Sequence, residues 1–429
     1  MRLLCLSNGH GEDAIAVQIL TQLQQLPNAP QIAALPIVGT GQAYKKLGNI
    51  PIISTVKSMP SGGFIYMDGG QFIRDINQGL IGLTFGQIKA VRNWAKQGGM
   101  ILAVGDIVPL LMAWVSGAPY AFVGTAKSEY YLRDEQGWLS RTSWQERWEG
   151  WSGSDYLPWE RWLISRQRCK AVFPRDTLTA EILSQWSIPV VDAGNPMMDH
   201  LQPPETVYKW RTFRDDTNTL TLTLLPGSRI PEAYQNWDII LQGITAIINT
   251  INSQRSMLPK KIVLFAAIAP SLNLDPFCHS LKAKNWHELN DVAALPYQLN
   301  SSDIIFHYKN ATLILTSEYN ACLDAGEIAI AMAGTATEQF VGLGKPAIAI
   351  PGKGPQFTPK FAEAQSRLLG LSLKVVSQPS QVPEVLLSLW QDSQQLQIIA
   401  ENGQRRLGKP GAASRIAQSI IRLSSTLEI

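Results

Sequence analysis

Residues 329–356 read AIAMAGTATEQFVGLGKPAIAIPGKGPQ, and this stretch decides the fold. A first apolar run ends at Gly334, a short mixed segment follows, and a second apolar run over 347–350 stops at Pro351. Apolar runs of this length are typical of strands that are buried on both faces, as in a parallel sheet. The stretch therefore predicts a strand, a glycine-tipped turn, a short helix and a second strand.

The turn at Gly334 predicts a binding site for an anion. Thr335 and Thr337 supply hydroxyls that can cap the helix, and the free N–H groups of a helix N-terminus attract phosphate. Glu338 follows in the first turns of the helix, where its carboxylate can accept hydrogen bonds from the two vicinal hydroxyls of a ribose. The alternative is that Glu338 is present only because the helix dipole favours an acidic residue there.

Length and composition narrow the class of protein. At 429 residues the chain is too long for one ordinary core, so two domains are expected. Hydrophobic residues make up 45% and charged residues 17%, which is typical of a soluble globular protein, and a formal charge of +3 does not indicate a nucleic-acid partner. The cysteines are far apart and form no CxxC pair, so neither a zinc site nor a disulfide framework is expected: Cys5, Cys169, Cys278 and Cys322.

The sequence predicts neither export nor a membrane span. The apolar run at the N-terminus is too short for a signal peptide, so a cytoplasmic protein is expected. Residues 100–124 carry a single charge, but Asp106, Pro109 and Gly117 interrupt them. We therefore predict a strand, a helix and a strand in this segment.

The first loop of the chain, residues 7–11, joins a strand over 2–6 to a helix over 12–26. Its two glycines are a weak dinucleotide signal, and Glu12 and Asp13 place two carboxylates where a phosphate would lie, so phosphate is disfavoured here. The loop could instead bring His10 to the mouth of a cleft. The alternative is a turn histidine that bonds to local backbone. Further strands are expected over 31–38, 50–56, 171–173 and 189–192.

Two segments of the first half have unusual compositions. Residues 58–85 are rich in glycine yet contain many large apolar side chains, which predicts either a mobile apolar lid or a packed loop with a helix. Residues 127–170 contain six of the thirteen tryptophans. Trp144, Trp148 and Trp151 follow i, i+4, i+7 spacing, so they would share one face of a helix and could contact a membrane or a lipid acceptor. The alternative is that these indoles pack into the first domain.

The second half begins after a connector over 203–216 and repeats the alternation of strand and helix. Strands are expected over 220–225, 261–267 and 311–316, with helices over 232–251 and 411–423. The loop that follows the first of these strands contains Gly227, Ser228 and Arg229, with no acidic residue before Glu232. Small residues and an arginine ahead of a helix suit a diphosphate, so this loop is the better phosphate site.

The expected fold class is therefore α/β, with two Rossmann-like doubly wound domains that face a central cleft. The first domain is expected to cover residues 1–196 and the second 197–410, with a C-terminal helix over 411–429 that can cross back to the first domain. The loops after residue 6 and after residue 105 then open on the same edge of one sheet.

Three motifs carry a resemblance to a known family. The segment 225–229, LPGSR, is similar to LPGSR-E, the segment 334–338, GTATE, is similar to SGTA-LE, and 194–196, GNP, matches an interdomain motif. On these residues the chain resembles nucleotide-sugar glycosyltransferases with the two-domain GT-B fold, and is most similar to lipid-A-disaccharide synthase and its related proteins. The opening segment 8–13, NGHGED, departs from the GEASGD of that family.

The resemblance implies a UDP-sugar donor in the second domain and a lipid or glycolipid acceptor in the first. The donor residues are then Gly227, Ser228, Arg229, Gly334, Thr335, Ala336, Thr337, Glu338, Lys353 and Gln356. No Asp-x-Asp motif is present in the sequence, so no metal and no other cofactor is expected, and Arg229, Lys353 and the helix N-terminus would stabilise the departing UDP.

Proton removal from the acceptor requires a base, and His10 and Asp106 are the candidates. A histidine of ordinary pKa suits a base at pH 7, so His10 is favoured, with Asp106 orienting it or the acceptor. Asp106 could instead only cap the following helix. Two other functions remain open. One is a UDP-sugar 2-epimerase or hydrolase, and the other is a non-catalytic protein that binds a UDP-sugar or a lipid.

Overall fold

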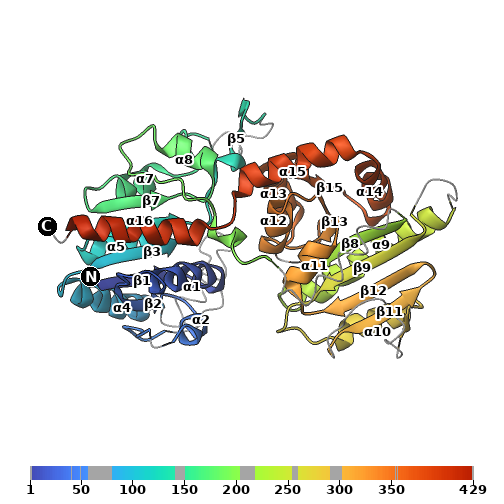
Figure 1. Ribbon diagram of the computed structural model, residues 1–429, viewed down its shortest axis with the longest axis horizontal. Coiled ribbons are helices and arrows are strands. Elements are labelled where there is room, and N and C mark those ends of the chain that lie inside the picture. Colours follow the sequence, from blue (N-terminus) through green and yellow to red (C-terminus); the bar gives the residue numbers. More distant parts are fainter. Residues whose placement is uncertain are drawn as a thin grey trace. The chain divides into compact units, whose positions relative to one another are not determined.

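The computed structural model describes residues 2–39, 41–48, 50–56, 80–140, 150–202, 218–253, 259–289, 302–352, 354 and 356–427. The chain divides into two compact units (Figure 1). Unit 1 comprises Met1–Asp199 and Gly408–Ile429, and unit 2 comprises His200–Leu407. From the sequence we expected these divisions after residues 196 and 410. Both units are α/β structures, and each is described by itself.

Unit 1 contains a parallel sheet in the order β2-β1-β3-β4-β7. Its strands are β1 (Arg2–Ser7), β2 (Gln31–Pro36), β3 (Met100–Gly105), β4 (Tyr120–Gly124) and β7 (Cys169–Phe173). The chain places β2 on one side of β1 and then continues on the other side with β3, so the strand order reverses between β1 and β3. Doubly wound sheets bind their ligands at the carboxyl ends of the strands beside such a switch point.

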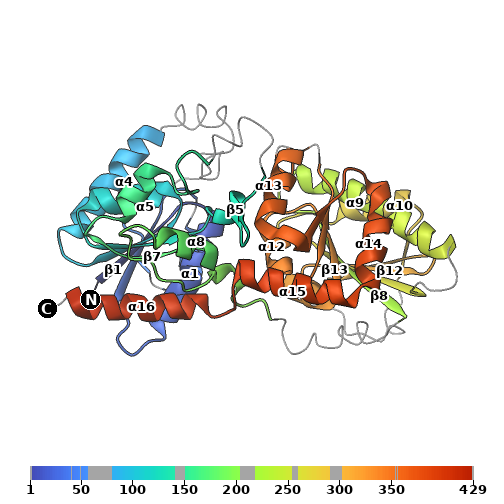
Figure 2. The same ribbon diagram turned by 90° about the horizontal axis from the view of Figure 1, so that it is seen from above.

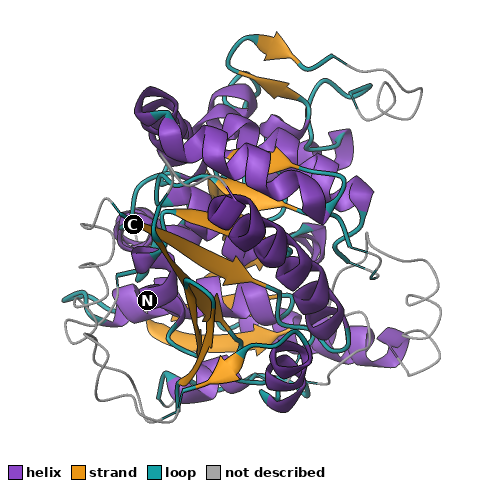
Figure 3. Ribbon diagram, turned by 90° about the vertical axis from the view of Figure 1, so that its right-hand side faces the viewer, coloured by secondary structure: helices purple, strands orange, loops and turns teal. Residues whose placement is uncertain are grey.

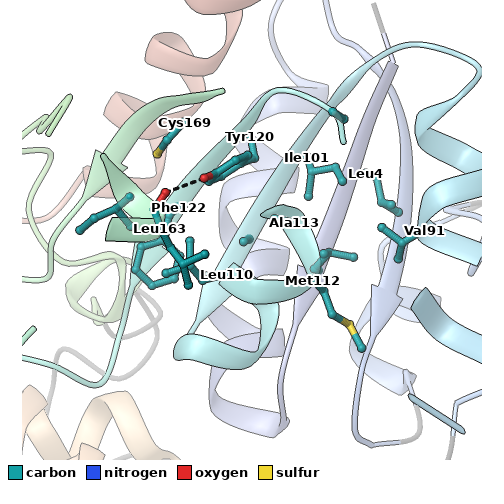
Figure 4. Close-up of a cluster of buried hydrophobic side chains, with 14 of the residues drawn as sticks. Leu4, Val91, Ile101, Leu110, Met112, Ala113, Tyr120, Phe122, Leu163 and Cys169 are labelled. Atoms are coloured by element: carbon teal, nitrogen blue, oxygen red, sulfur yellow. Dashed lines mark hydrogen bonds between the residues drawn. The ribbon is translucent and has the colours of Figure 1, made fainter. Parts of the chain in front are cut away.

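The two faces of this sheet carry separate apolar cores, because successive residues of a strand point to opposite faces. Leu4 belongs to the core under α4 (Leu80–Ala95), α5 (Ile107–Ser116) and α7 (Pro158–Ile164), which Figure 4 shows. The hydroxyl of Tyr120 within that core donates to the carbonyl of Leu163 at 2.6 Å, so the buried phenol is satisfied. Residues 100–124 form β3, α5 and β4, which confirms the expected strand, helix and strand.

The opposite face is covered by α1 (His10–Gln24), α2 (Gln42–Lys46) and the C-terminal helix α16 (Ala412–Leu427), as Figure 2 shows for α1 and α16. The carboxylate of Asp199 accepts hydrogen bonds from the amides of Gly411, Ala412 and Ala413, which satisfies the first N–H groups of α16. Helix α16 packs on α1 and so completes unit 1.

Two of the strands that we expected in unit 1 are reduced to single bridges. Residues 50–56 pair only through Ala34↔Ile52, and residues 189–192 pair only through Val172↔Val190. Each segment contains a proline, at 51 and at 189, whose carbonyl accepts a bond from the neighbouring strand. A proline has no N–H to donate in return, so neither ladder extends.

The two unusual segments of the first half are described only in part. Residues 57–79 and 141–149 lie outside the described residues, and with them most of the expected lid, Trp144 and Trp148. From Leu80 onward the first segment is helix α4, on which Phe85 is 70% exposed. Trp151 lies in a turn, so the helical face that we expected does not extend to it.

Unit 2 contains a larger sheet in the order β10-β11-β12-β9-β8-β13-β14-β15, in which β11 is antiparallel to both of its neighbours and all other pairings are parallel. Its strands are β8 (Thr219–Leu225), β9 (Lys261–Ala267), β10 (His287–Glu288), β11 (Ile304–Tyr308), β12 (Ala311–Thr316), β13 (Ile328–Ala331), β14 (Ala347–Ala349) and β15 (Leu373–Val375). The order reverses between β8 and β13, which is the switch point of this unit.

Helices flank the sheet of unit 2 (Figure 3). They are α9 (Glu232–Ser253), α10 (Asp275–Ala283), α11 (Tyr319–Ala325), α12 (Thr335–Gly342), α13 (Pro359–Leu369), α14 (Val382–Gln391) and α15 (Ser393–Leu407). Residues 329–356 form β13, a turn, α12 and β14, which confirms the predicted element order. Within the described residues, no helix is both long and apolar enough to cross a membrane.

Candidate functional site

The loops that follow β8 and β13 lie against each other at the switch point of unit 2. The amide of Met332 donates to the carbonyl of Leu225 at 2.8 Å, where the two strands end. Gly227 has a φ of +93°, and a Cβ atom there would lie 3.3 Å from the carbonyl oxygen of Met332. Only glycine combines this conformation with so close an approach. The two segments that the sequence selected for phosphate are thus neighbours, although about a hundred residues separate them.

The first turns of helix α9 hold three loops of this edge in place. The Asn236 amide donates to the carbonyls of Pro226 at 3.0 Å and Met332 at 3.2 Å, so one side chain ties both loops together. The buried Glu232 carboxylate accepts hydrogen bonds from the amides of Gln356 at 3.1 Å and Phe357 at 2.7 Å. Neither Asn236 nor Glu232 was selected as a site residue from the sequence. The available signal for Glu232 was the glutamate of the LPGSR-E segment in the family that the chain resembles, because Glu232 follows Arg229 by three positions.

Helix α12 begins at Thr335, and its N-cap is Gly334, without a side-chain cap. Our expectation that threonine hydroxyls cap this helix is therefore wrong. Thr337 is buried, and its hydroxyl donates at 2.6 Å to the carbonyl of Ala333, one turn back in the chain. The Gln365 amide also donates to the carbonyls of Ala333 and Gly334. The loop is thus held by its carbonyls. The amides of Thr337 and Glu338 both donate to the carbonyl of Gly334, so an anion at this helix N-terminus would meet the amides that precede them.

The remaining donor candidates differ in exposure. Ser228, Arg229 and Thr335 are exposed, and Glu338 is half-buried in the first turns of α12. Lys353 lies outside the described residues. A glycine loop, a helix N-terminus, a guanidinium and a carboxylate therefore occur together at one sheet edge. The first three suit an anion, and the last suits a pair of hydroxyls.

The corresponding edge of unit 1 brings together the loops after β1 and β3. The side-chain amide of Asn8 donates to the Asp106 carboxylate at 3.2 Å, which confirms that the two loops open on the same edge. Asp106 is the N-cap of α5 and accepts a bond from the amide of Val108 at 2.9 Å, so it has the capping role that we considered as its alternative. His10 is the first residue of α1, and its side chain is not described.

Burial is the largest influence on the pKa values of Asp106 and Glu12 at this edge. It raises the pKa of Asp106, against the hydrogen bonds from Val108 and Asn8, which lower it. Burial and, next, the charge of Asp106 raise the pKa of Glu12 to about 8. The neighbouring Asp13 is also buried and accepts a hydrogen bond from the hydroxyl of Ser7. From the sequence, the two carboxylates of Glu12 and Asp13 indicated only that phosphate is disfavoured here.

Four tryptophans of unit 1 are each between 45% and 56% exposed, and we call them the exposed tryptophans: Trp138, Trp151, Trp159 and Trp162. The guanidinium of Arg133 lies 4.0 Å from the ring centroid of Trp138, and that of Arg166 lies 4.4 Å from that of Trp162. These four indoles are therefore not part of the core. Indoles and cations at a surface suit an interface that is apolar on one side and anionic on the other.

Buried ionic contacts fix the segment that carries these tryptophans. Lys127 forms an ion pair of 2.7 Å with Glu160, whose carboxylate also accepts from the amide of Leu157 at the start of α7. Glu129 is fully buried and accepts bonds from the hydroxyl of Ser154 and the amide of Asp155. The exposed tryptophans thus lie on a well-anchored part of unit 1.

No protein-family model matches the chain, and no curated protein matches it in sequence. Solved structures match it over nearly the whole length. A putative UDP-N-acetylglucosamine 2-epimerase from Listeria monocytogenes is 13% identical, with a TM-score of 0.54 over 100% of this chain and 97% of that one. MurG from Acinetobacter baumannii is 15% identical, with a TM-score of 0.51 over 98% and 99%. CalG4, the calicheamicin glycosyltransferase, is 11% identical, with a TM-score of 0.56 over 99% and 98%.

These three structures have the GT-B fold, and so does this chain. The predicted fold class is thereby confirmed. At identities of 11–15% the similarity shows the fold alone. Function has to be argued from the residues of this chain.

Proposed function

We propose that the protein transfers a sugar from a UDP-sugar to a lipid-linked or glycolipid acceptor. The observation that carries the proposal is the close contact of two loops at the β8–β13 switch point, where Gly227 packs on the carbonyl of Met332 beside the N-terminus of α12. Ligands of doubly wound sheets bind at such an edge, and a helix N-terminus with a glycine loop suits a phosphate.

In the proposed donor complex, the diphosphate lies over the loop at 227–229 and the first amides of α12, and Arg229 neutralises part of its charge. Glu338 accepts hydrogen bonds from the ribose hydroxyls. As the sugar departs, negative charge develops on UDP, and Arg229, Lys353 and the helix dipole stabilise it. The hydroxyl of Thr337 donates to the carbonyl of Ala333 and so helps to hold this loop in place beside the diphosphate.

The proposal assigns the acceptor to unit 1. The resemblance of the chain to lipid-A-disaccharide synthase, carried by the segments 194–196, 225–229 and 334–338, favours a lipid A precursor or a related glycolipid as acceptor. The exposed tryptophans and the arginines beside them support a peripheral position on a membrane, since indoles favour membrane–water interfaces. For a protein expected in the cytoplasm, this is the cytoplasmic face. The acceptor hydroxyl needs a base, for which His10 and Asp106 at the β1–β3 edge are the candidates from the sequence.

The second candidate function is a UDP-sugar 2-epimerase or hydrolase, which acts without a second sugar or lipid. It is favoured by the similarity in fold to 2-epimerases, one of which, from Neisseria meningitidis, was solved with UDP-N-acetylglucosamine and has a TM-score of 0.54 at 14% identity. The exposed tryptophans favour the transferase, because an enzyme of a small soluble substrate does not need a surface of indoles.

One experiment separates these functions. The protein is incubated with radiolabelled UDP-sugars and a total extract of membrane lipids. A transferase moves the label into the organic phase, an epimerase or hydrolase leaves it in a new water-soluble product, and a binding protein leaves the donor unchanged. Label that enters only water-soluble products, with lipid present, would replace the transferase by the second candidate.

We predict that Glu232→Ala weakens UDP binding by several-fold, because it removes the acceptor that holds the amides of Gln356 and Phe357 beside the donor site. Loss of a charged acceptor for these N–H groups costs on the order of 1.5–3 kcal/mol. Most of this free energy is expected to be lost from the stability of the loop, and the rest from UDP binding. Glu232→Gln keeps an acceptor oxygen and is the matched control. Calorimetric titration with UDP measures both, and equal losses in the two variants would contradict this loop-holding role.

We predict that the exposed tryptophans bind membranes. Replacing Trp138, Trp151, Trp159 and Trp162 together by serine should reduce sedimentation with anionic vesicles while UDP affinity is unchanged, because the indoles lie in unit 1 and the proposed donor site in unit 2. Replacing Trp186, a less exposed indole of the same unit, by serine serves as a control. If the quadruple variant sediments with the vesicles as much as the wild type does, the proposed membrane contact of these tryptophans is wrong.

A further inference from the structure

Glu12 is a buried carboxyl group beside the switch point of unit 1, and neither the fold nor the proposed function has so far used it. It lies in the first turn of α1, immediately after the loop that follows β1, and it is only 6% exposed. Its Oε2 atom has no hydrogen-bond partner among the residues that the structure describes. A buried carboxyl oxygen without a partner is costly, so its presence points to a ligand that supplies one.

The position of Glu12 is fixed against the loop after β3. A Cβ atom on Gly105 would lie 3.0 Å from Cγ and 3.6 Å from Cδ of Glu12, so the glutamate side chain occupies the space above this glycine. Gly105 has a φ of +133° and directly precedes Asp106. The carboxyl groups of Glu12 and Asp106 thus lie close together at the carboxyl ends of β1 and β3, where a doubly wound sheet binds its ligand.

The two carboxyl groups differ in their hydrogen bonds. Asp106 accepts from the amide of Val108 and from the side-chain amide of Asn8, whose nitrogen lies 3.2 Å and 3.4 Å from the two carboxylate oxygens. These donors favour the ionised form of Asp106. Glu12 has an oxygen without such a donor in the described part of the chain. Of the pair, Asp106 therefore has the more stabilised anion, and Glu12 is the group better able to take up and release a proton.

The electrostatic surroundings of Glu12 support this division. Burial, the charge of Asp106 from the β3 loop and the charge of Asp13 from α1 raise the pKa of Glu12 to about 8, against its own backbone amide. His10 lies two residues earlier, and its side chain is outside the described part. A carboxyl group that titrates near neutral pH is matched to general acid–base work.

We infer that Glu12 is the proton acceptor for the hydroxyl group that attacks the sugar, with Asp106 and Asn8 as its positioning partners. The inference rests on the proposed function. In the step, the acceptor oxygen forms a bond to the anomeric carbon of the sugar and its proton passes to the Glu12 carboxylate. The bond between the anomeric carbon and the diphosphate oxygen breaks, and its electron pair leaves with UDP. Release of the proton to water restores the carboxylate.

The first test reads the carboxyl group directly in the resting protein. Glutamate labelled with ¹³C at Cδ is incorporated into the full chain, and the carboxyl resonances are followed by NMR against pH. One resonance should titrate near pH 8, be absent from Glu12→Gln, and titrate at lower pH in Asp106→Asn, where a neutral residue replaces the charge. Titration of every glutamate below about pH 6, the range of ordinary carboxyl groups, overturns the inference.

The second test is kinetic. Glu12→Gln should lower kcat by roughly 10²–10⁴-fold while UDP affinity is unchanged. It should also remove the rise of turnover up to about pH 8 that we expect of the wild type. Glu181→Gln makes the same chemical change at an exposed position of α8 (Thr177–Leu183) and should behave as wild type.

The outcomes separate the inference from the proposed function. Near-normal turnover of Glu12→Gln beside an inactive His10→Ala variant overturns the inference and assigns the proton to His10. If the wild type transfers no sugar from any UDP-sugar, the proposed function fails and the role of Glu12 in transfer fails with it, whereas a Glu12 resonance that titrates near pH 8 would still show a proton-exchanging carboxyl group at this edge.

Discussion

The variant Gly403→Ala is expected to unfold unit 2 at a markedly lower temperature than the wild-type protein. Gly403 lies inside α15 where this helix crosses α12, and a Cβ atom there would overlap the carbonyl oxygen of Val341 and lie 3.1 Å from its carbonyl carbon. The contact is with backbone, so no side chain can move aside. Overpacking of this kind costs about 1–3 kcal/mol or more, which corresponds to a shift of roughly 3–10 °C for a domain of this size.

The matched control is Gly86→Ala. Gly86 also lies inside a helix, α4 of unit 1, but a Cβ atom there would meet nothing within 4 Å. The same substitution should therefore stabilise the protein by about 0.5–1 kcal/mol, because alanine favours the helix. Differential scanning calorimetry measures both. Because α12 carries Glu338, the Gly403 variant should also bind UDP more weakly below its transition. Equal midpoints for the two variants would show that α15 adjusts without cost.

The variant Glu338→Ala is expected to weaken UDP binding at least tenfold and leave the fold intact. Glu338 is half-buried in the first turns of α12, where the proposal places the ribose hydroxyls. Removing a charged acceptor of hydrogen bonds costs about 1.5–3 kcal/mol of binding free energy. Calorimetric titration with UDP and with uridine monophosphate should show the same loss, since both ligands contain the ribose.

Glu384→Ala separates this role from that of the helix dipole. Glu384 is an exposed glutamate in the first turn of α14, so its replacement removes the same favourable interaction with a helix N-terminus. Both variants should therefore lose similar, small amounts of stability, and only Glu338→Ala should lose UDP affinity. If UDP binds to both variants as to the wild type, the helix dipole alone accounts for an acidic residue at position 338, and the proposed ribose contact is wrong.

Much of the fold follows from local patterns. The bounds of β9 and β12 coincide with those expected from runs of apolar residues, because a buried parallel strand must be apolar on both faces. The short pairing of residues 50–56 and 189–192 could not be predicted from apolar runs. It depends on which residue of the neighbouring strand lies opposite the proline of each segment. The helix predicted for the tryptophan segment was wrong at Trp151, because regular spacing also occurs in a turn.

The candidate site could be predicted only in part. Gly227 and Gly334 were found because glycine permits the sharp turns and close backbone approaches that occur where a strand ends, and the structure brings their loops together. Asn236 and Gln365 were missed, because an amide in a helix carries no local sign of the distant carbonyl to which it donates. The threonine caps at 335 and 337 were wrong, because the N-cap is Gly334 and the buried hydroxyl of Thr337 bonds to the preceding turn.

The sequence by itself determined the alternation of strands and helices, the glycine loops at the strand ends, and through them two doubly wound sheets. These features depend on periodicity and on backbone conformation, which neighbouring residues control. Only the tertiary structure decided that Glu12 lies buried above Gly105 with an oxygen left without a described partner, while Asp13, the next residue, is satisfied by Ser7. The two acidic residues look alike in the sequence. They differ because burial and hydrogen bonding depend on what the fold places beside each side chain, which is the distant β3 loop for Glu12 and the Ser7 hydroxyl for Asp13.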